Sequence, residues 1–441
     1  MRIFFLYSTV AALALSGFAA AQFVLPSMMS HEYSHDAAAS TTVQKTLTKN
    51  TSASAQQNTD VVAATATDPR PLVAHVPQPH PQKVMYMTSC IVGTPALREP
   101  LVTFLKQSEF NSIIIDIKDF SGTLSYEPRS PEWKDAWDSA RCGAKDMREF
   151  VALLHKKNIY VIGRITTFQD PFYTVRHPDE AVKKASDRTN WKDFKGLSFI
   201  DVSAEPYHKH IVQLAIDSYN AGFDELNFDY VRYPSDGNMK DIAFLHGERT
   251  KPENLESFFK YLHEQLSDPK NFEAVKHENT GRATNTPYMS ADLFGMTTTN
   301  TDDLSIGQVL ERALPYFDFI DPMVYPSHYP KSFLGLGDPN KNVYRVVNYS
   351  MGEAVRRAKA STTPVAGFAQ TRIGTSTPAK YQKPIYDIQK LRPWLQDFQY
   401  GGTYGVPEIR AQIKATYDTG LTSWMIWDPA NRYTRGAYLT K

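Results

Sequence analysis

F-D-E-L-N-F-D-Y-V-R-Y-P, residues 223–234, is the stretch from which the fold of this chain can be predicted. Read as a β-strand, its side chains alternate between two faces. Leu226 and Phe228 fall on one face, which is apolar enough to lie beneath a helix. Asn227 and Asp229 fall on the other face, where a carboxylate needs a polar cavity or a partner. The stretch therefore predicts a strand that carries an acid at its C-terminal end.

A cation follows this acid. Arg232 lies three residues beyond Asp229, and Tyr233-Pro234 ends the strand and begins a loop. A buried structural pair between Asp229 and Arg232 would explain the same residues. The other strands therefore have to decide between a structural and a functional interpretation.

From Lys83 onward, short β-rich runs alternate with stretches of helical periodicity, which is typical of a parallel α/β fold. The expected strands are 84–88, 112–118, 159–165, 225–231, 288–293, 319–325, 364–369 and 421–427. The expected helices are 95–107, 146–157, 205–221, 253–265, 304–314, 351–360 and 407–419. Eight strands with seven helices between them predict a (β/α)8 TIM barrel whose last helix is short or missing.

The connecting segments favour the same fold. Connections from helix to strand are short, whereas those from strand to helix are long, among them 120–145, 166–204 and 370–406. Long βα loops lie on the C-terminal face of a barrel, where barrel enzymes build their active sites. An open doubly wound sheet is the competing fold, but no G-x-G-x-x-G opens a helix after the first strand.

Polar side chains gather where the expected strands end, and carboxylates occur at five of the eight ends. So many carboxylates, together with cations and a tryptophan, favour a catalytic or binding pocket over a purely structural network. In chain order the candidate residues are Asp116, Lys118, Asp119, Arg164, Asn227, Asp229, Arg232, Asp292, Asp321, Tyr325, His328, Trp427 and Asp428.

Paired carboxylates beside aromatic rings are what glycosidic bond cleavage uses, because one acid protonates the leaving oxygen while the second acts as nucleophile or activates water. We expect Asp229 and Asp292 to be this catalytic pair, in an order that stays open, and the other candidates to bind the substrate. A carboxyl separation of ~5–5.5 Å would predict retention and ~6.5–9.5 Å inversion. Should the two lie apart, Asp229 would pair instead with Asp116, Asp119 or Asp321.

Composition narrows the class of partner. The chain has 441 residues and a net charge of +1, which argues against an electrostatic nucleic-acid binder. Tyr and Phe number 24 each, which suits a large core and a sugar-binding cleft. A carbohydrate is the expected partner, and the oligomeric state stays open. No cofactor is expected; a divalent metal among Asp116, Asp119, Asp229 and Asp292 is the weaker alternative.

The first 82 residues do not read as part of the barrel. Residues 1–21 have a short basic start, an apolar run and an Ala-Ala-Ala exit, which predicts a secretory signal peptide and export to the cell envelope or the exterior. An uncleaved membrane anchor is the alternative. Residues 22–82 are rich in Ala, Ser, Thr, Gln and Pro, which predicts a disordered linker before a barrel domain of residues 83–441. The H-E-Y-S-H match to zinc peptidases at 31–35 lacks a helix with a core to pack on, so we take it as chance.

The chain resembles the putative glycosyl hydrolase domain family. The stretches that carry the resemblance are I-D-I-K-D-F-S-G (115–122), the stretch at 223–234, M-S-A-D-L-F-G (289–295), F-I-D-P-M-V-Y-P-S-H-Y (319–329) and S-W-M-I-W-D-P-A-N-R-Y (423–433). They span nearly all of residues 83–441. The resemblance implies a barrel and a glycosidase activity, and it names no substrate.

A more distant similarity is to chitinase-type glycoside hydrolases. Met323-Val324-Tyr325 and Trp427 resemble elements of their sixth and eighth strands, and Asp229 resembles the last Asp of their fourth-strand motif. The catalytic Glu of that motif, two residues further on, falls on Val231. Substrate-assisted chitinase chemistry therefore does not carry over.

Two functions of different classes remain open. One is an exported glycoside hydrolase that acts on an envelope or extracellular polysaccharide by carboxylate catalysis. The other is a catalytically inactive barrel that binds glycan or scaffolds an envelope complex, and the absence of the chitinase Glu keeps it open.

Cys90 and Cys142 are the only cysteines. Export would place both in an oxidising compartment, where two cysteines often pair. Cys90 follows the first expected strand and Cys142 lies in the loop after the second, so both lie on the same face of the predicted barrel. We expect a disulfide that holds the loop of Trp133 and Trp137; two unrelated thiols are the alternative.

Overall fold

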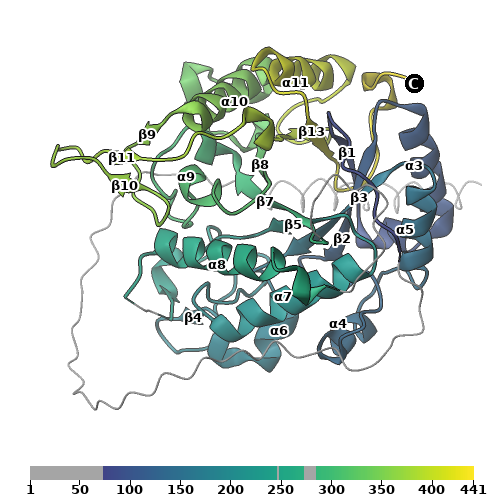
Figure 1. The fold of residues 1–441 in the computed structure, drawn as a ribbon, viewed down its shortest axis with the longest axis horizontal. Coiled ribbons are helices and arrows are strands. Elements are labelled where there is room, and N and C mark those ends of the chain that lie inside the picture. Colours follow the sequence, from purple (N-terminus) through teal and green to yellow (C-terminus); the bar gives the residue numbers. More distant parts are fainter. Residues whose placement is uncertain (1–72, 246–247, 273–284) are drawn as a thin grey trace, which may run out of the picture. The chain divides into compact units, whose positions relative to one another are not determined.

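The computed structural model describes residues 73–245, 248–272 and 285–441, and within them eight parallel strands form a closed barrel, as expected (Figure 1). The spatial order is β1-β13-β12-β8-β7-β5-β3-β2, so the chain places each barrel strand beside the previous one. The barrel strands are β1 (Lys83–Met87), β2 (Ser112–Lys118), β3 (Tyr160–Thr166), β5 (Glu225–Asp229), β7 (Tyr288–Phe294), β8 (Phe319–Met323), β12 (Trp394–Gln396) and β13 (Trp424–Trp427).

Helices surround this barrel, and the longer ones follow the strands in turn (Figure 1). They are α2 (Ser89–Val92), α3 (Pro95–Gln107), α4 (Lys134–Asp138), α5 (Met147–His155), α6 (Pro171–Arg176), α7 (Glu205–Asn220), α8 (Lys251–Leu266), α9 (Leu310–Ala313), α10 (Val343–Lys359) and α11 (Val406–Asp418). No α-helix follows β13 in residues 428–441, all of which are described, so the predicted shortage of a last helix is confirmed. None of the described helices is long and apolar enough to cross a membrane.

Short strands outside the barrel build two small sheets in the loops. One pairs β4 (Lys183–Lys184) with β6 (Ile242–Ala243), and the other joins β9 (Thr362–Thr363), β10 (Thr371–Arg372) and β11 (Tyr381–Gln382). The first sheet links the loop after β3 to the loop after β5, both at the C-terminal end of the barrel. The expected long βα loops are therefore partly ordered by their own structure.

The seventh barrel strand is not where the sequence predicted it. Residues 364–369 form no strand, and the barrel is completed by β12. Trp394 packs inside the barrel and Leu395 outside it, as a strand requires, but three residues are too few to show a period of two. The expected strand was taken from an apolar pair, Val365-Ala366, which lies in the loop that carries the three-stranded sheet.

Two predicted helices also have different bounds. The helix expected at 304–314 is reduced to α9, because Leu304 and Ser305 have φ angles of 51° and 59°, which a right-handed helix does not allow. The helix expected at 351–360 begins earlier, at Val343. Its additional turns bury Val346 and Val347 on the face that already carries Met351.

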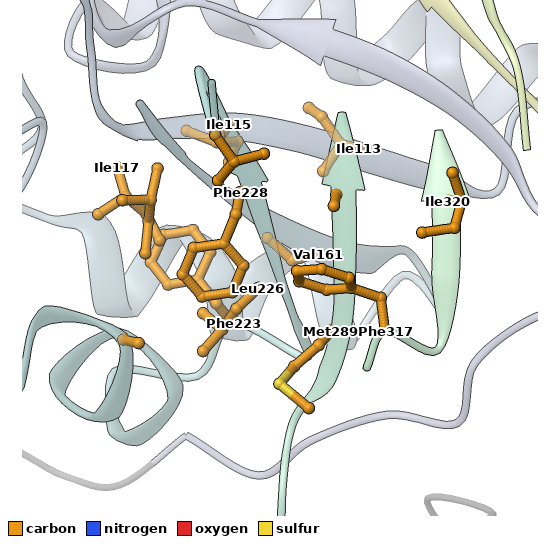
Figure 2. Packing of buried hydrophobic residues seen from close by; sticks show 14 of the residues in the cluster. Ile113, Ile115, Ile117, Val161, Phe223, Leu226, Phe228, Met289, Phe317 and Ile320 are labelled. Carbon is orange, nitrogen blue, oxygen red and sulfur yellow. The ribbon is translucent and has the colours of Figure 1, made fainter. Parts of the chain in front are cut away.

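The hydrophobic core lies between the barrel and the helices (Figure 2). Ile113, Ile115 and Ile117 of β2 point outward into this layer, and so do Leu226 and Phe228 of β5. All five are 0% exposed. Each such side chain contributes about 1.5–3 kcal/mol by burial. Because one face of each strand is fixed in this apolar layer, the other face is forced into the barrel interior.

Residues 73–82, which the sequence assigned to the linker, pack against the barrel. Val73 is buried over Gly222, and His75 Nδ1 lies 3.2 Å from Asp224 Oδ1. Asp224 also accepts from the backbone N–H of Val76 and contacts His155 Nε2 at 2.9 Å. The folded part thus begins about ten residues before the predicted boundary. The predicted signal peptide, the linker up to residue 72 and the 31–35 motif lie outside the described residues.

Cys90 and Cys142, the expected pair, are joined by a disulfide bond with Cα atoms 4.6 Å apart. The bond connects α2 to the loop that follows β2. In that loop Trp137 lies over Gly143, where a Cβ atom would come within 2.5 Å of its ring. Trp133 is buried and stacks on His210 of α7, with ring centroids 3.8 Å apart. The disulfide therefore fastens a loop that is also packed onto the core.

Replacing both cysteines by serine should lower the free energy of unfolding of the full chain. The bond spans 52 residues, and on the chain-entropy model a loop of that size is worth about 4 kcal/mol. Denaturant unfolding measures the loss, and reduction of the unsubstituted protein should reproduce it. The double variant, as the control, should not respond to reductant. Equal unfolding midpoints for the oxidised and reduced protein would contradict the prediction.

Candidate active site

The C-terminal mouth of the barrel is organised around Arg164. Its Nη1 donates to Asp116 Oδ1 at 2.6 Å, and its Nε donates to Asp229 Oδ2 at 3.1 Å, with Nη2 donating to the same oxygen. The three residues come from neighbouring strands β2, β3 and β5, whose register places Asp116 opposite Arg164 and Arg164 opposite Asn227. The alternation predicted for the 223–234 stretch therefore brings Asp229 to a cation, which is Arg164 and not Arg232.

Asp292 lies near the same guanidinium nitrogen that donates to Asp229. Its Oδ2 is 3.8 Å from Arg164 Nε. Its Oδ1 accepts from Trp394 Nε1 at 2.7 Å and from Asn227 Nδ2 at 2.9 Å. The predicted pair, Asp229 and Asp292, is thus brought together on adjacent strands, with one arginine contacting both carboxylates.

Aromatic rings cover this group. Trp427 stacks on Tyr86 with centroids 4.0 Å apart, and the Arg164 guanidinium lies 5.0 Å from the centre of the Trp427 ring. Tyr86 donates its hydroxyl to Asp116 Oδ2 at 2.5 Å. Trp427 is half-buried, whereas Asp116, Arg164, Asp229 and Asp292 are each at most 5% exposed. The tryptophan is therefore a ring that solvent reaches at the mouth.

Burial and neighbouring charges raise the pKa of two of the carboxylates. Burial raises the pKa of Asp292 well above its ordinary value, and the negative charges of Asp229 and Asp321 raise it further. Burial also raises the pKa of Asp116, which Arg164 opposes. Asp229 accepts hydrogen bonds from two nitrogens of Arg164 and from the Tyr230 N–H at 2.5 Å. An acid with a raised pKa beside a carboxylate that an arginine binds is an arrangement that acid-base catalysis can use.

The backbone changes direction directly after Asp229. Tyr230 has a φ of 52°, a left-handed conformation that is uncommon for a residue other than glycine. Its N–H donates to the carboxylate before it, and its carbonyl accepts from Phe168 N at 3.3 Å. Such conformations are concentrated at functional sites, where the surrounding structure holds them in place.

A second ionic group, here called the base network, lies deeper in the barrel and consists of Gln82, Glu225, Asp321 and Arg392. Arg392 donates to Asp321 Oδ1 at 3.0 Å and Oδ2 at 2.8 Å, and to Glu225 Oε1 at 2.6 Å. It also donates to the Gln82 side chain. All four residues are 0% exposed. Asp321, expected to bind substrate, is therefore enclosed within the protein.

Lys118 does not join the mouth, although alternation placed it on the side of Asp116. The register between β2 and β3 shifts between Asp116 and Lys118, so Lys118 lies opposite Ile165, which faces the outer core. There its ammonium contacts Asp170 at 2.9 Å and donates to the Thr166 carbonyl at 2.6 Å. A β-bulge of this kind turns a side chain to the other face. Lys118 is thus a buried structural cation.

The remaining expected residues lie around the mouth in other roles. Asp119 accepts from Ser121 of its own loop and from Ser89 of α2, and Arg232 donates to Ser235 and the Tyr233 carbonyl. Asp428 accepts from Ala430 N at 2.7 Å and shapes the turn after β13.

Tyr325 and His328 form a wall with Phe398 and Tyr400, with ring centroids 5.3 to 6.0 Å apart. The pKa of Tyr325 is raised by burial and then by Asp292 and Asp229, so its hydroxyl lies near both acids.

Four important residues were not predicted from the sequence. Tyr86 could have been predicted, because the alternation of the expected first strand places it on the same face as Val84. Glu225 could also have been predicted, because it lies two residues before Asn227 and therefore on the same face of its strand. Arg392 and Trp394 could not be found in this way, because the strand that begins at Trp394, two residues after Arg392, was predicted elsewhere.

No cluster of metal-ligating side chains occurs in residues 73–245, 248–272 and 285–441. A cavity of about 890 Å³ lies away from the barrel mouth, beside α7 and α8, and is lined by residues such as His208, Phe244 and Tyr261. It contains none of the candidate residues. The barrel mouth, where the carboxylates and the arginine meet, is therefore the candidate site.

Comparison with known proteins concerns the barrel domain as a whole. The profile of a family described as "Putative glycosyl hydrolase domain" matches residues 84–433. The glycoside hydrolase domain of PgaB (BpsB) from Bordetella bronchiseptica aligns with a TM-score of 0.52 at 11% identity, covering 84% of this chain and 100% of that domain. At that identity the likeness supports the fold alone.

A hypothetical protein from Ruminiclostridium thermocellum is 29% identical over 41% of this chain and 92% of its own length, with a TM-score of 0.37. No curated protein gives a significant match.

Proposed function

The chain belongs to the putative glycosyl hydrolase domain family, and from this premise we propose that it hydrolyses glycosidic bonds at the barrel mouth, with Asp292 as general acid and Asp229 as nucleophile. The observation that carries the proposal is that Arg164 contacts both carboxylates, while burial raises the pKa of Asp292 well above its ordinary value. The family match covers both residues.

Asp292 suits the role of the acid. A general acid has to hold its proton until the leaving oxygen takes it, which requires a raised pKa. Burial supplies that at Asp292, and the neighbouring negative charge of Asp229 adds to it. After the glycosidic bond breaks, the resulting Asp292 carboxylate is stabilised by the N–H groups of Trp394 and Asn227, which already point at Oδ1.

Asp229 suits the role of the nucleophile. Its Oδ2 is 3.1 Å and Asp292 Oδ2 is 3.8 Å from Arg164 Nε, so these two oxygens are at most about 7 Å apart. This upper limit is compatible with the carboxyl separation of about 5–5.5 Å that is typical of retaining enzymes. It is compatible with only the lower end of the range found in inverting enzymes. We therefore assign a retaining mechanism, in which Asp229 forms the glycosyl-enzyme intermediate.

The proposed export rests on the sequence and the disulfide, and the proposed class of substrate rests on the aromatic rings at the barrel mouth. The signal-like residues 1–21 and the disulfide support an extracytoplasmic protein, for which an envelope or extracellular polysaccharide is the fitting substrate. Trp427 presents an exposed ring face next to the acids, which suits stacking against a sugar.

The test is a panel of envelope and extracellular polysaccharides incubated with the full chain. The expected result is release of reducing ends from at least one polysaccharide, with retained anomeric configuration in the first product seen by NMR. Asp229→Asn should abolish the release, whereas Asp217→Asn should keep it, because Asp217 is a buried carboxylate on α7, outside the group of candidate residues, that accepts from the backbone N–H groups of Arg129 and Ser130. Inverted product would exclude Asp229 as nucleophile.

A glycan-binding barrel without turnover is the second candidate. The observation in its favour is that Asp229 and Asp292 are only 5% and 1% exposed, which leaves little surface for a reacting sugar. The same panel separates the two, because a binder would retain a polysaccharide in a pull-down without releasing reducing ends.

A further inference from the structure

Asn227 and Asp321 lie directly beneath the candidate acid and touch no solvent, since both are 0% exposed. Asn227 is the residue before Phe228 on β5 and points into the barrel, between the mouth and the base network. Asp321 is the direct register partner of Asp292 on the neighbouring strand β8. Neither residue can reach a substrate, so the substrate-binding role expected from the sequence does not apply to them.

The amide of Asn227 joins the two acids. Its Nδ2 lies 2.9 Å from Asp292 Oδ1 and 3.2 Å from Asp321 Oδ2, and also 3.1 Å from Ser290 Oγ. Asp321 in turn accepts hydrogen bonds from Nε and Nη2 of Arg392, and Glu225 accepts a hydrogen bond from the same arginine. The continuous chain Glu225–Arg392–Asp321–Asn227–Asp292 therefore fixes the position of the acid from the floor of the barrel.

The amide of Asn227 also has an unused acceptor. Its Oδ1 is buried and has no hydrogen-bond partner among the described residues. Burying an amide oxygen that has no hydrogen-bond partner costs free energy of folding, which the hydrogen bonds of the NH2 group have to offset. Here the donor end serves both carboxyl groups, Asp292 and Asp321.

We propose, on the basis of the proposed function, that Asn227 and Asp321 are positioning residues for the acid Asp292. Asn227 holds the carboxyl that delivers the proton, and Asp321 is a fixed negative charge placed one strand away by Arg392. The two act in opposite senses, because a donated hydrogen bond favours the ionised acid and a nearby negative charge favours the protonated acid.

The groups that face Asp292 are few. Arg164 comes from β3, Asp229 from β5, Asp321 from β8 and Tyr325 from the loop after β8. Burial raises the pKa of Asp321 to about 6 even with Arg392 beside it, so at neutral pH Asp321 supplies its negative charge. The pKa of Asp292 responds to this charge in the upward direction and to the Asn227 hydrogen bond in the downward direction.

The test is an infrared titration of the full chain, which needs no substrate. The carbonyl-stretching band of the protonated Asp292 carboxyl is identified by its loss in Asp292→Asn, and its midpoint is followed with pH. Asp321→Asn should lower this midpoint by about one pH unit or more, because a like charge within a few ångströms is removed. Asn227→Leu should raise it, because the donor to the ionised form is lost. Asp217→Asn, the control on α7, should leave it unchanged.

Opposite shifts in the two variants are the result that supports the proposal, since a loss of packing would not give opposite signs. Shifts of the same sign, or none in variants that still unfold cooperatively on heating, would overturn it. Where a substrate of the full chain is found, the high-pH limb of kcat should move in the same directions as the infrared midpoints. If no substrate is found, the infrared midpoints alone decide whether the positioning role is correct. If turnover occurs and neither variant shifts the infrared midpoint, the proposed function is retained and the positioning role is rejected.

Discussion

Replacing Asp292 by asparagine should reduce kcat by about 10²–10⁴-fold on a polysaccharide substrate, which is the usual contribution of a positioned general acid. Asparagine keeps the acceptor that Trp394 and Asn227 contact at Oδ1, so the fold should not change. What is lost is the proton for the leaving oxygen. An aryl glycoside whose leaving group needs no protonation should therefore lose far less rate than the polysaccharide, and comparison of kcat for the two substrates measures the difference.

Asp229→Ala provides the complementary result. It removes the nucleophile, and added azide should restore turnover by attacking from the space that the carboxylate leaves, giving a glycosyl azide of inverted configuration. Equal losses for both substrates in Asp292→Asn, or azide rescue of Asp292→Ala that gives a glycosyl azide of inverted configuration, would exchange the two roles. Unchanged kcat in both variants would remove the pair from the mechanism altogether.

Arg392→Met should destabilise the fold by about 3–5 kcal/mol, the cost of removing one partner from a buried ion pair. Arg392 is 0% exposed and is the only cation that contacts Glu225 and Asp321 among the described residues. Methionine fills a similar volume but leaves both carboxylates without a counter-charge. Denaturant unfolding at neutral pH measures the loss, and Arg356→Met is the matched control. Arg356 pairs with Glu353 on the surface of α10 and is worth at most about 1 kcal/mol.

The pH dependence of the Arg392→Met variant has a definite sign. Arg392 lowers the pKa of Asp321, so its removal raises the folded-state pKa further above the unfolded one. A group with a raised folded pKa stabilises at low pH and loses that contribution as pH rises through the folded value. The deficit of the variant should therefore shrink as pH falls toward 4 and grow above about 6. A deficit independent of pH would show that lost packing, and not lost charge, is the cause.

The sequence predicted the parts of this fold that alternate over many residues. β2 and β5 could be drawn because their outward isoleucines, Leu226 and Phe228 repeat every second position, and the same period placed Asp116 and Asp229 inside the barrel. β12 could not be drawn, because three residues carry no period, and with it Arg392 and Trp394 were missed. The bulge at Lys118 was also hidden, because a register shift depends on the partner strand.

The partner of Asp229 illustrates the same limit. Arg232 is near in sequence, yet its side chain turns to its own loop, and the cation that binds Asp229 comes from the next strand. The proximity of Asp229 and Asp292 could nevertheless be predicted, because the two carboxylates lie on adjacent strands. Which of the two holds a proton depends on burial and on neighbours that only the three-dimensional structure supplies.

Trp427 gives the barrel mouth an optical signal of its own. Of the six tryptophans, Trp133, Trp191, Trp394 and Trp424 are less than 2% exposed, and Trp137 is packed beside the disulfide loop. Only the indole of Trp427 is stacked on Tyr86, beside the arginine that contacts both acids. A saccharide that covers it would alter its emission, and of the other tryptophans only Trp394, whose Nε1 donates to Asp292, is described at the same site. Ligand affinity can thus be followed by fluorescence in a variant that no longer turns over, so that occupancy of the mouth and chemistry at it become separately visible.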